Sequence, residues 1–517
     1  MRKHLLLSTL AALAFSAQAE IKLPAIIGDN MVLQQKQTNP IWGWDTPGTK
    51  VTVTFGGQTK TGEAGADGKW TVKLDPVPAS AKPATMNIKG TTSKSLKNIL
   101  VGEVWICSGQ SNMQWSVNAS YDADLEIATA KFPNIRLISV PQVGTQEPQD
   151  DFKGAWAECS PANVGSFSAV GFFFGRTLHQ VLDVPVGLIN NAWGGSAAEA
   201  WVRRDVLAKD ARFKTLMESW AAREKVLSSE KAKQDHEKAL AAWKKRAEDA
   251  KAAKREFRER APQSPQQQLT GNSRPGNIYN GVLRPTIGYG IKGAIWYQGE
   301  SNASRAYEYG YLFPLMITHW RDEWKQGDFP FYWVQLADFK AEQPLPGDSD
   351  WAELRESQTK TQNAIKNGGQ AVIIDIGEGR DIHPRNKRDV ADRLVRLALA
   401  KDYGMKIPYR SPEYKNVEIQ GNKAIVTLDT FGSSLYTCDV QEVKGLAVCG
   451  EDKKWVWATG KLLGADKIEV SAPGVAKPVA VRYAWSDNPV CNLFSKEGLP
   501  VTPFRTDSFD MITKPKM

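Results

Sequence analysis

The sequence lacks the long apolar runs that membrane proteins need. A transmembrane helix takes about 20 consecutive apolar residues, and beyond its first 19 residues the chain has no run of that kind. Those first residues carry two basic residues, then a shorter apolar stretch, then Ala17-Gln18-Ala19. This order is typical of a bacterial secretory signal. We therefore expect residues 1–19 to be removed and the mature chain to be periplasmic or secreted, without membrane insertion.

Cysteine is scarce, with five residues in 517. An exported protein matures in an oxidising compartment, where five cysteines allow two disulfides and leave one thiol. Cys438 and Cys449 lie on two β-type runs close together in the sequence, so we predict a local bridge between them. Cys107 has apolar neighbours, and we expect it to be a buried packing residue.

Histidine is equally scarce: there are five, and four of them follow the signal. These four show no His-x-x-x-His pair or comparable ligand spacing, which disfavours a metal hydrolase. His236 lies in a charged segment, and His179 and His319 lie within helical patterns. His383 is therefore the histidine best placed for catalysis.

Net charge is weak as well. The formal charge of +9 falls to +7 without the signal, and this mild excess disfavours nucleic acid as a partner. The strongest charge feature is local, because residues 221–260 hold 13 Lys or Arg and 8 Asp or Glu in an Ala-rich background. Mixed charges of this density predict a solvated helix or helical hairpin rather than a binding patch.

The apolar patterns that are present divide the chain into three parts. Residues 20–99 alternate short β-type runs with Gly- and Pro-rich turns, which predicts a small antiparallel sandwich-like module. Residues 100–404 alternate apolar strands with helical stretches, which predicts an α/β domain with a parallel sheet. The charged helical insertion and a loop interrupt it at 205–275. Residues 405–517 return to β-type runs and predict a second β-rich module.

Within the α/β part, the pattern predicts strands at 101–107, 184–190, 291–298, 329–336 and 370–376, and helices at 167–182, 309–324, 351–365 and 387–404. Four of these strands end in polar loops that contain glycine. Ligands of an open parallel sheet collect at the carboxyl ends of its strands. We therefore expect these loops to converge on one site.

Ser111 follows the first of these strands in "GQSNMQW", residues 109–115, with Gly109 two residues before it. Such a serine is found in ordinary turns, and it is also typical of a nucleophile held at the edge of a sheet. A serine nucleophile needs a histidine base and usually a third group that orients the base. His383 and Asp381 follow another strand and could face the same side of an extended loop, while Asp375 and Glu378 are alternative third members.

Two further strand ends could donate hydrogen bonds to an oxyanion. "NAWGGSAAEAW" offers the backbone of Gly194 and Gly195, and "QGESNAS" offers the side chain of Asn302, with Gln298 as a second option. Trp193 in the first of these loops could stack on a sugar ring. Gln298, Glu300 and Trp193 are the candidate substrate contacts.

The sequence resembles the sialate O-acetylesterase family, a branch of the SGNH-type serine hydrolases. Four blocks in the same order carry the resemblance: "GEVWICSGQSNMQW", "NAWGGSAAEAW", "AIWYQGESNA" and "RDIHP". The resemblance covers roughly residues 100–400, and it implies a flavodoxin-like three-layer domain. The implied activity is the removal of O-acetyl groups from sugars through an acetyl-serine intermediate, without metal or organic cofactor.

Carried over by motif, Ser111 is the nucleophile, His383 the general base and then acid, and Asp381 the orienting carboxylate. The backbone N–H of Ser111, Gly195 and Asn302 become the oxyanion donors. One departure concerns the acid, which many SGNH hydrolases place three residues before the histidine, where this chain has Arg380. The substrate alternatives are an acetylated sialic acid and an acetylated plant polysaccharide. The rival functions are a non-catalytic glycan-binding protein and a serine esterase or lipase for acyl lipids.

Overall fold

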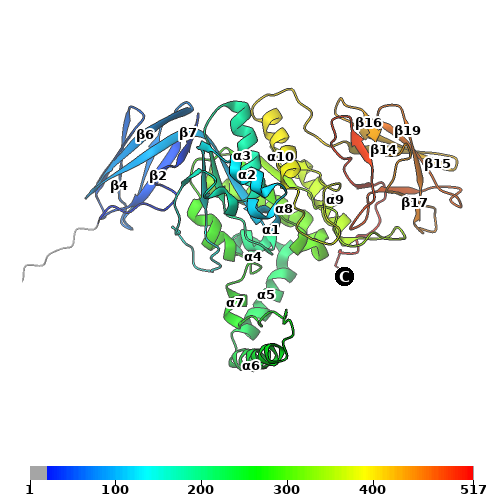
Figure 1. The fold of residues 1–517 in the computed structure, drawn as a ribbon, viewed down its shortest axis with the longest axis horizontal. Helices are drawn as coiled ribbons and strands as arrows, with labels where there is room; N and C mark the ends of the chain where they lie inside the picture. The colour runs from blue at the N-terminus through cyan, green and yellow to red at the C-terminus, as the bar shows by residue number, and fades with distance from the viewer. Residues whose placement is uncertain (1–19, 516–517) are drawn as a thin grey trace, which may run out of the picture.

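The computed structural model describes residues 20–515, and the predicted signal peptide lies outside this range. Three parts follow one another along the longest axis (Figure 1): β-strands at the amino-terminal end, a central body of strands and helices, and a second group of strands at the carboxyl-terminal end. None of the helices in the described range is long and apolar enough to cross a bilayer.

The central body is built on a mixed sheet with the strand order β13-β12-β11-β7-β10-β8-β9. All neighbours in this order run parallel except β9, which runs antiparallel to β8. The strands are β7 (Ser93–Gly109), β8 (Phe132–Ser139), β9 (Ala157–Cys159), β10 (Val186–Asn190), β11 (Gly293–Tyr297), β12 (Phe331–Val334) and β13 (Gly368–Ala371). The chain fills one side of β7 first and then crosses to the other, so the order reverses at β7.

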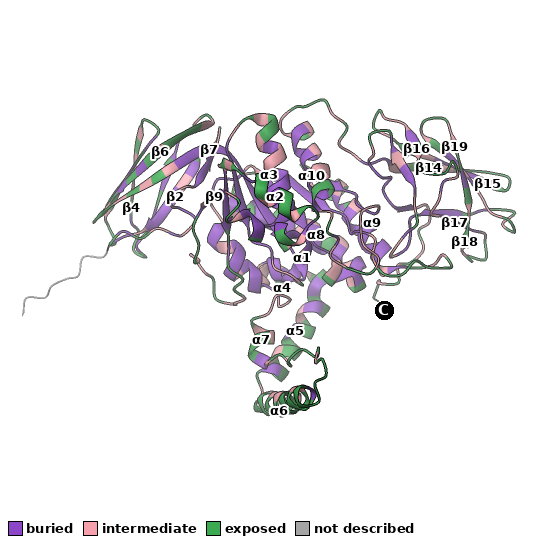
Figure 2. Ribbon diagram, viewed as in Figure 1, coloured by how far each residue is buried: buried purple, intermediate pink, exposed green. Residues whose placement is uncertain are grey.

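Helices cover both faces of this sheet, as the alternation of side chains along β7 requires. Trp105 and Cys107 pack with α3 (Ala169–Leu182) and α10 (Lys387–Lys401), whereas Val104 and Ile106 belong to the core that contains α8 (Ala306–Trp324) and α9 (Asp350–Ala364). β10, β11 and β12 are buried along their whole length, as is the second half of β7 (Figure 2). The prediction of an α/β body with a central sheet is confirmed, and the sheet is parallel as predicted except at β9. Cys107 is a fully buried packing residue.

The amino-terminal strands share β7 with the central sheet. The first half of β7 pairs with β6 and the second half with β10 and β11, so the predicted boundary at residue 99 falls inside one continuous strand. β1 runs parallel to β7, whereas an antiparallel module was predicted. The strands are β1 (Val32–Gln34), β2 (Asn39–Trp44), β3 (Lys50–Phe55), β4 (Gln58–Glu63), β5 (Lys69–Leu74) and β6 (Ser80–Lys89).

The charged segment forms a helical projection from the central body (Figure 1). It contains α4 (Arg204–Lys209), α5 (Lys214–Leu227), α6 (Glu230–Ala252) and α7 (Pro265–Leu269). In α6 the only buried residue is Ala250. Figure 2 shows most of this helix as exposed. The charged segment was predicted to be a solvated helix or helical hairpin, and in the structure it is helical and mostly exposed.

The carboxyl-terminal strands form three small sheets, β14-β15-β20-β19, β16-β22 and β18-β17-β21-β23. They are β14 (Glu413–Gln420), β15 (Lys423–Asp429), β16 (Leu435–Thr437), β17 (Leu446–Cys449), β18 (Val456–Trp457), β19 (Thr459–Leu463), β20 (Lys467–Ser471), β21 (Ala480–Tyr483), β22 (Leu493–Ser495) and β23 (Phe504–Arg505). Their core also takes in Val372 and Ile374 from the central body, so the two parts are packed together.

Two predictions for this region are wrong. The strand predicted at 370–376 ends at Ala371, because β12 beside it ends at Val334 and the following residues turn away to pack under the carboxyl-terminal strands. The predicted bridge between Cys438 and Cys449 is absent, and all five cysteines are free. Cys438 follows β16, which pairs with β22, while Cys449 ends β17, which belongs to a different sheet.

Candidate active site

Ser111 lies at the carboxyl end of β7, where the strand order reverses, and it opens the short helix α1 (Ser111–Gln114). Gly109 makes this strand-to-helix turn, with a φ of +134°. A side chain at this position would place its Cβ 2.2 Å from the carbonyl oxygen of Tyr297 on β11. Only glycine fits so close an approach of two backbones, and the turn presents the Ser111 hydroxyl at the strand ends.

The hydroxyl of Ser111 meets the imidazole of His383. The Nε2 atom of His383 is 2.8 Å from Oγ of Ser111, although the two residues are 272 positions apart. His383 lies in the loop 377–386 that leads into α10. This distance is that of a hydrogen bond between a nucleophile and its base.

Asp381 holds the other side of the histidine. Its Oδ1 atom accepts a hydrogen bond of 2.9 Å from the backbone N–H of His383 and lies 3.5 Å from the ring Nδ1. The second distance exceeds that of an ordinary hydrogen bond. The Asp381 side chain is 49% exposed. Asp375, an alternative third member, is instead held by two hydrogen bonds from Arg393.

Trp115 also orients the histidine. The two rings are stacked, with centroids 4.7 Å apart and planes inclined by 13°. The indole Nε1 of Trp115 donates to the carbonyl oxygen of Ala119 at 2.8 Å, which fixes the plane of the stack. Trp115 is the last residue of the motif "GQSNMQW", so a search for aromatic residues beside Ser111 could have found this role.

A buried polar network lies behind the Ser111–His383 pair. The Asn112 side chain donates to Oε1 of Glu300 at 2.7 Å and to the carbonyl oxygen of Ile382 at 3.0 Å, and it accepts from Nζ of Lys387 at 2.6 Å. Since Ile382 lies between Asp381 and His383 in the sequence, Asn112 ties the histidine loop to the serine helix. The local sequence does not distinguish Asn112 or Lys387, because neither residue type is unusual in its pattern.

Burial shifts the pKa values of these groups. It lowers the pKa of His383, which the Asp381 carboxylate raises and the Lys387 cation lowers further, so the imidazole is neutral at neutral pH. Burial lowers the pKa of Lys387 to about 7, with the carboxylates of Glu300, Asp381 and Glu378 acting in the opposite direction. Burial raises the pKa of Glu300, while Asn112 and Lys387 lower it.

The predicted oxyanion donors lie in the loops on the two sides of Ser111. Gly194 is so close to the nucleophile that a Cβ there would lie 3.3 Å from the Cβ of Ser111, and its N–H donates to Oε1 of Gln114 at 2.7 Å. Gly195 follows with a φ of +71°. Asn302 is buried, and its Nδ2 donates to Glu199 at 3.0 Å while its Oδ1 accepts from Gln298 and from the backbone of Ala198.

The structure does not support Gln298 as a substrate contact. It is fully buried, its Nε2 donates to Ser196 and Asn302, and its Oε1 accepts from Tyr309. Glu300 likewise points into the network with Asn112, and its Oε2 atom is buried without a hydrogen-bond partner. Gln298 follows β11 directly and is fully buried, whereas Glu300 opens the 3₁₀ turn η7 (Glu300–Arg305) and is partly buried. Trp193 is half-buried, and its backbone N–H donates to the carbonyl oxygen of Gly109.

An open hollow of about 680 Å³ lies at Ser111 and His383. Ser111 and His383 line it together with Gln114 and Trp115, and Val140 and Ala192 add apolar surface from the ends of β8 and β10. The hollow is large enough for a small ligand. Within residues 20–515 there is no group of three or more His, Cys, Asp or Glu side chains that could hold a metal ion.

Known proteins match the chain across this site and beyond it. A family model described as carbohydrate esterase, sialic acid-specific acetylesterase matches residues 101–233 and 273–375. The gap between the two segments coincides with most of α6 and the loop after it. The sialate O-acetylesterase of Mus musculus is 30% identical over 551 aligned residues, which cover 97% of each chain. That of Homo sapiens is 28% identical and covers 95% of this chain and 93% of its own.

A solved structure also matches almost the whole chain. The crystal structure of a carbohydrate acetylesterase from Xanthomonas citri is 36% identical, with a TM-score of 0.80, and the match covers 95% of this chain and 100% of that one. The chain thus shares both its sequence and its arrangement in space with esterases of acetylated carbohydrates. Because these relatives match it over nearly their full length, the chain belongs to the sialate O-acetylesterase family of carbohydrate esterases.

Proposed function

We propose that this chain is a carbohydrate O-acetylesterase that acts through an acetyl-serine intermediate. The observation that carries the proposal is the 2.8 Å contact between Oγ of Ser111 and Nε2 of His383. A neutral imidazole at this distance can remove the hydroxyl proton as the oxygen attacks an ester carbonyl. The lowered pKa of His383 supports this role, because it keeps the base unprotonated at neutral pH.

The reaction proceeds in two halves. Oγ of Ser111 bonds to the acetyl carbon, His383 takes the hydroxyl proton, and the carbonyl oxygen becomes negative. When the tetrahedral intermediate collapses, the bond to the sugar oxygen breaks and His383 protonates that oxygen. A water molecule then repeats the sequence on the acetyl-serine, which releases acetate and restores the hydroxyl. Asp381 stabilises the imidazolium that forms in each half.

The oxyanion donors in this proposal are the backbone N–H groups of Ser111 and Gly195 and the amide of Asn302. Loss of one such donor typically costs about 100 to 1,000-fold in turnover. The place of Gly195 directly after Gly194, which lies against Ser111, supports its assignment. Asn302 fits the role through its second amide hydrogen, since its bond to Glu199 uses one.

The substrate class that we propose is an O-acetylated sugar, either an acetylated sialic acid or an acetylated plant polysaccharide. The names of the relatives support an O-acetylated sugar as the substrate class, because they include sialate O-acetylesterases and a carbohydrate acetylesterase. The proposed place of action is the bacterial periplasm or the exterior, after removal of residues 1–19. The proposed organisation keeps an esterase part, 100–404, between two β-rich parts, 20–99 and 405–517, with β7 shared by the first β-rich part and the esterase part.

Replacement of the nucleophile tests the proposal. We expect Ser111→Ala to fold normally and to lower the turnover of a chromogenic acetate ester at least about 10,000-fold, because the covalent step is lost. Rapid quenching of the wild-type enzyme followed by intact-mass spectrometry should show an added acetyl group, and Ser111→Ala should show none. Near-normal turnover in the variant would refute the assignment.

The same assay separates the rival functions. A non-catalytic glycan-binding protein would not hydrolyse the acetate ester above background. A lipase would prefer long acyl chains to acetate, so a series of esters from acetate to palmitate decides between the two kinds of esterase. We expect activity to fall steeply after the shortest acyl groups.

A further inference from the structure

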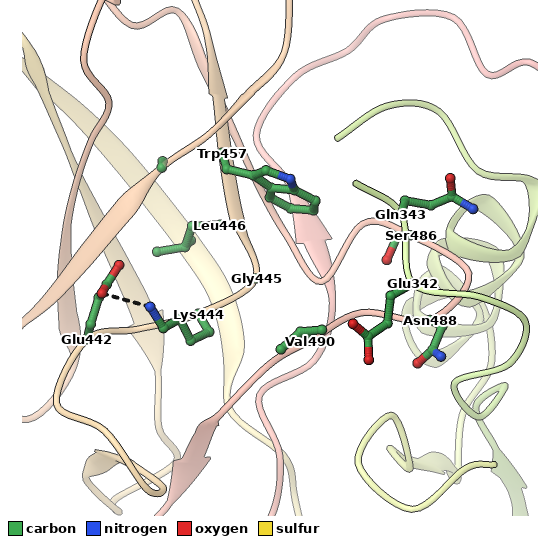
Figure 3. A pocket seen from close by; sticks show the side chains of 11 residues that line it. Glu342, Gln343, Glu442, Lys444, Gly445, Leu446, Trp457, Ser486, Asn488 and Val490 are labelled. Carbon is green, nitrogen blue, oxygen red and sulfur yellow. Dashed lines mark hydrogen bonds and ion pairs between the residues drawn. The ribbon is translucent and has the colours of Figure 1, made fainter. Parts of the chain in front are cut away.

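A second cavity lies apart from the catalytic hollow, between the carboxyl-terminal strands and the loop that follows β12. It has a volume of about 290 Å³, at the small end of the range for ligand pockets. Figure 3 shows its two sides, with Leu446 on β17 and Lys444 just before this strand on one side, and Glu342 and Gln343 on the loop on the other. The proposed esterase reaction does not use this cavity.

One residue that lines the cavity is a partly exposed tryptophan, Trp457. Trp457 lies on the two-residue strand β18, and its residue surface is 42% exposed. Its indole Nε1 donates to the carbonyl oxygen of Pro344 at 2.9 Å, so one edge of the ring is fixed. An exposed ring that is held in one orientation can stack on an apolar face of a ligand without losing much conformational entropy.

The polar side chains that line the cavity can form hydrogen bonds with the hydroxyl groups of a ligand. The carboxylate of Glu342 and the side-chain amides of Gln343 and Asn488 line the cavity opposite the strands (Figure 3). Carboxylates accept hydrogen bonds and amides both donate and accept, which is the combination that a sugar ring with several hydroxyls can use. Leu446 and Val490 add apolar surface.

The charges of the lining disfavour an acidic ligand. Glu442 pairs with Lys444 at 2.7 Å within the cavity, so the lysine cation is already matched by a carboxylate. Glu342 then leaves the lining with a formal excess of one negative charge. A sugar that carries a carboxylate, such as sialic acid, would be repelled, whereas a neutral sugar would not.

The cavity lies close to the catalytic loop. The side chain of Asn488 donates to the carbonyl oxygen of Lys340 at 2.8 Å, and a Cβ at Gly379 would lie 2.8 Å from the same amide nitrogen. Gly379 is four residues from His383 in the sequence, so their Cα atoms are at most about 14 Å apart. A chain of several sugar residues can span such a distance.

We propose that this cavity binds a neutral polysaccharide chain whose acetylated part lies in the catalytic hollow. This inference rests on the proposed esterase function and narrows its substrate class to neutral acetylated polysaccharides. Trp457 stacks on one sugar ring, and Glu342 and Gln343 bind its hydroxyls. The site raises affinity for the polymer rather than the rate of the chemical step.

Trp457→Ala tests the site. Isothermal titration calorimetry of the wild type with unacetylated xylan and xyloglucan oligosaccharides should show binding to at least one of them, and the variant should bind about tenfold more weakly, the loss expected for one stacked ring. In kinetics, the KM of the variant for the acetylated polymer should be about tenfold higher than that of the wild type. Its KM for a small acetate ester should equal that of the wild type. Gln343→Ala, at an exposed loop position, should show a smaller change in the same direction.

Tyr436→Ala is the matched control, since Tyr436 is 41% exposed on β16 of the same region but does not line the cavity. It should bind and turn over the polymer as the wild type does. Equal binding of the polymer by wild type and Trp457→Ala would overturn the proposal. Binding of polysialic acid or of an unfolded polypeptide that depends on Trp457 would overturn it too.

The binding experiment needs no hydrolysis, so the two proposals can fail separately. If the wild type binds the neutral polymer through Trp457 but does not hydrolyse an acetate ester, the esterase function is wrong and the binding site stands. If the ester is hydrolysed but Trp457→Ala binds every neutral polymer as the wild type does, the binding site is wrong. The proposed binding site is also wrong if the wild type binds no neutral polymer.

Discussion

At the scale of single residues, the pKa of His383, the proposed base, depends on the charged groups around it. The groups that act on His383 are Asp381, which raises its pKa, and Lys387, which lowers it, in addition to burial. The Glu300 carboxylate acts in turn on Lys387 and is joined to it through Asn112. Lys387 carries its charge below pH 7, which is the range in which a histidine with a lowered pKa titrates.

Lys387→Met should therefore shift the pH profile of the proposed esterase. The enzyme is active when His383 is neutral, so activity is present above its pKa and is lost as the pH falls through it. Without the Lys387 cation the pKa of His383 rises, and the acidic limb of kcat/KM for an acetate ester moves to higher pH. Kinetics between pH 4 and 9, together with thermal unfolding of each variant, measure this shift.

Lys401→Met provides the control at the same helix. Lys401 lies at the other end of α10, about 21 Å along the helix axis from Lys387, and its Nζ donates to the carbonyl oxygen of Gly368. Its replacement should leave the acidic limb in place. An unshifted limb in Lys387→Met would show that the lysine has only a structural role.

At the scale of secondary-structure elements, the site depends on how closely β7 and β11 approach each other. The chain passes from β7 to α1 at Gly109, where the backbone of Tyr297 leaves no room for a Cβ. The positive φ at this glycine adds a conformational cost for any other residue. The same turn aims Ser111 at His383, so stability and activity should be lost together.

We expect Gly109→Ala to lower the free energy of unfolding by about 3 kcal/mol or more, because backbone strain and a steric clash add to each other. Gly48→Ala separates the two effects. Gly48 also has a positive φ, +80°, but has open space where its Cβ would lie, so its loss should be only about 1 kcal/mol. Urea denaturation of both variants gives the comparison, and equal losses would contradict the steric argument.

At the scale of the whole molecule, the helical projection is attached to the body at its base. Glu224 on α5 accepts hydrogen bonds from Arg204 and Arg274, and Asn272 donates to the carbonyl oxygen of Gly194 beside Ser111. Beyond this base, α6 contributes almost nothing to the core. The base therefore supports the loop of the site, and the outer part does not contact it.

Replacement of residues 229–262 by a short Gly/Ser linker should leave the site intact. The buried residues Leu227 and Pro265 remain on the two sides of the linker. We expect kcat/KM for a small acetate ester to stay within about twofold of the wild type, as for other exposed segments without core contacts. A large loss in a variant whose thermal unfolding is unchanged would assign the projection a part in the reaction.

Much of this molecule follows from local patterns in the sequence. Hydrophobic spacing predicted four central helices and most of the central strands, because apolar periodicity reports directly on the face that is buried. The strand at 370–376 was predicted too long for a reason that lies outside the segment. Its length depends on where β12 ends, and Val372 and Ile374 pack with residues from the carboxyl-terminal strands.

The sequence by itself determined which residues had the chemistry for a site: Ser111 two residues after a glycine, and one histidine outside the helical patterns and the charged insertion. Only the tertiary structure decided which of them act together. It joined Ser111 to His383, turned Gln298 inward, kept Cys438 and Cys449 in separate sheets, and buried Lys387 against Asn112. The physical reason is that reactivity and pKa depend on distance and burial between segments far apart in the chain, and these follow from packing rather than from neighbours in the sequence.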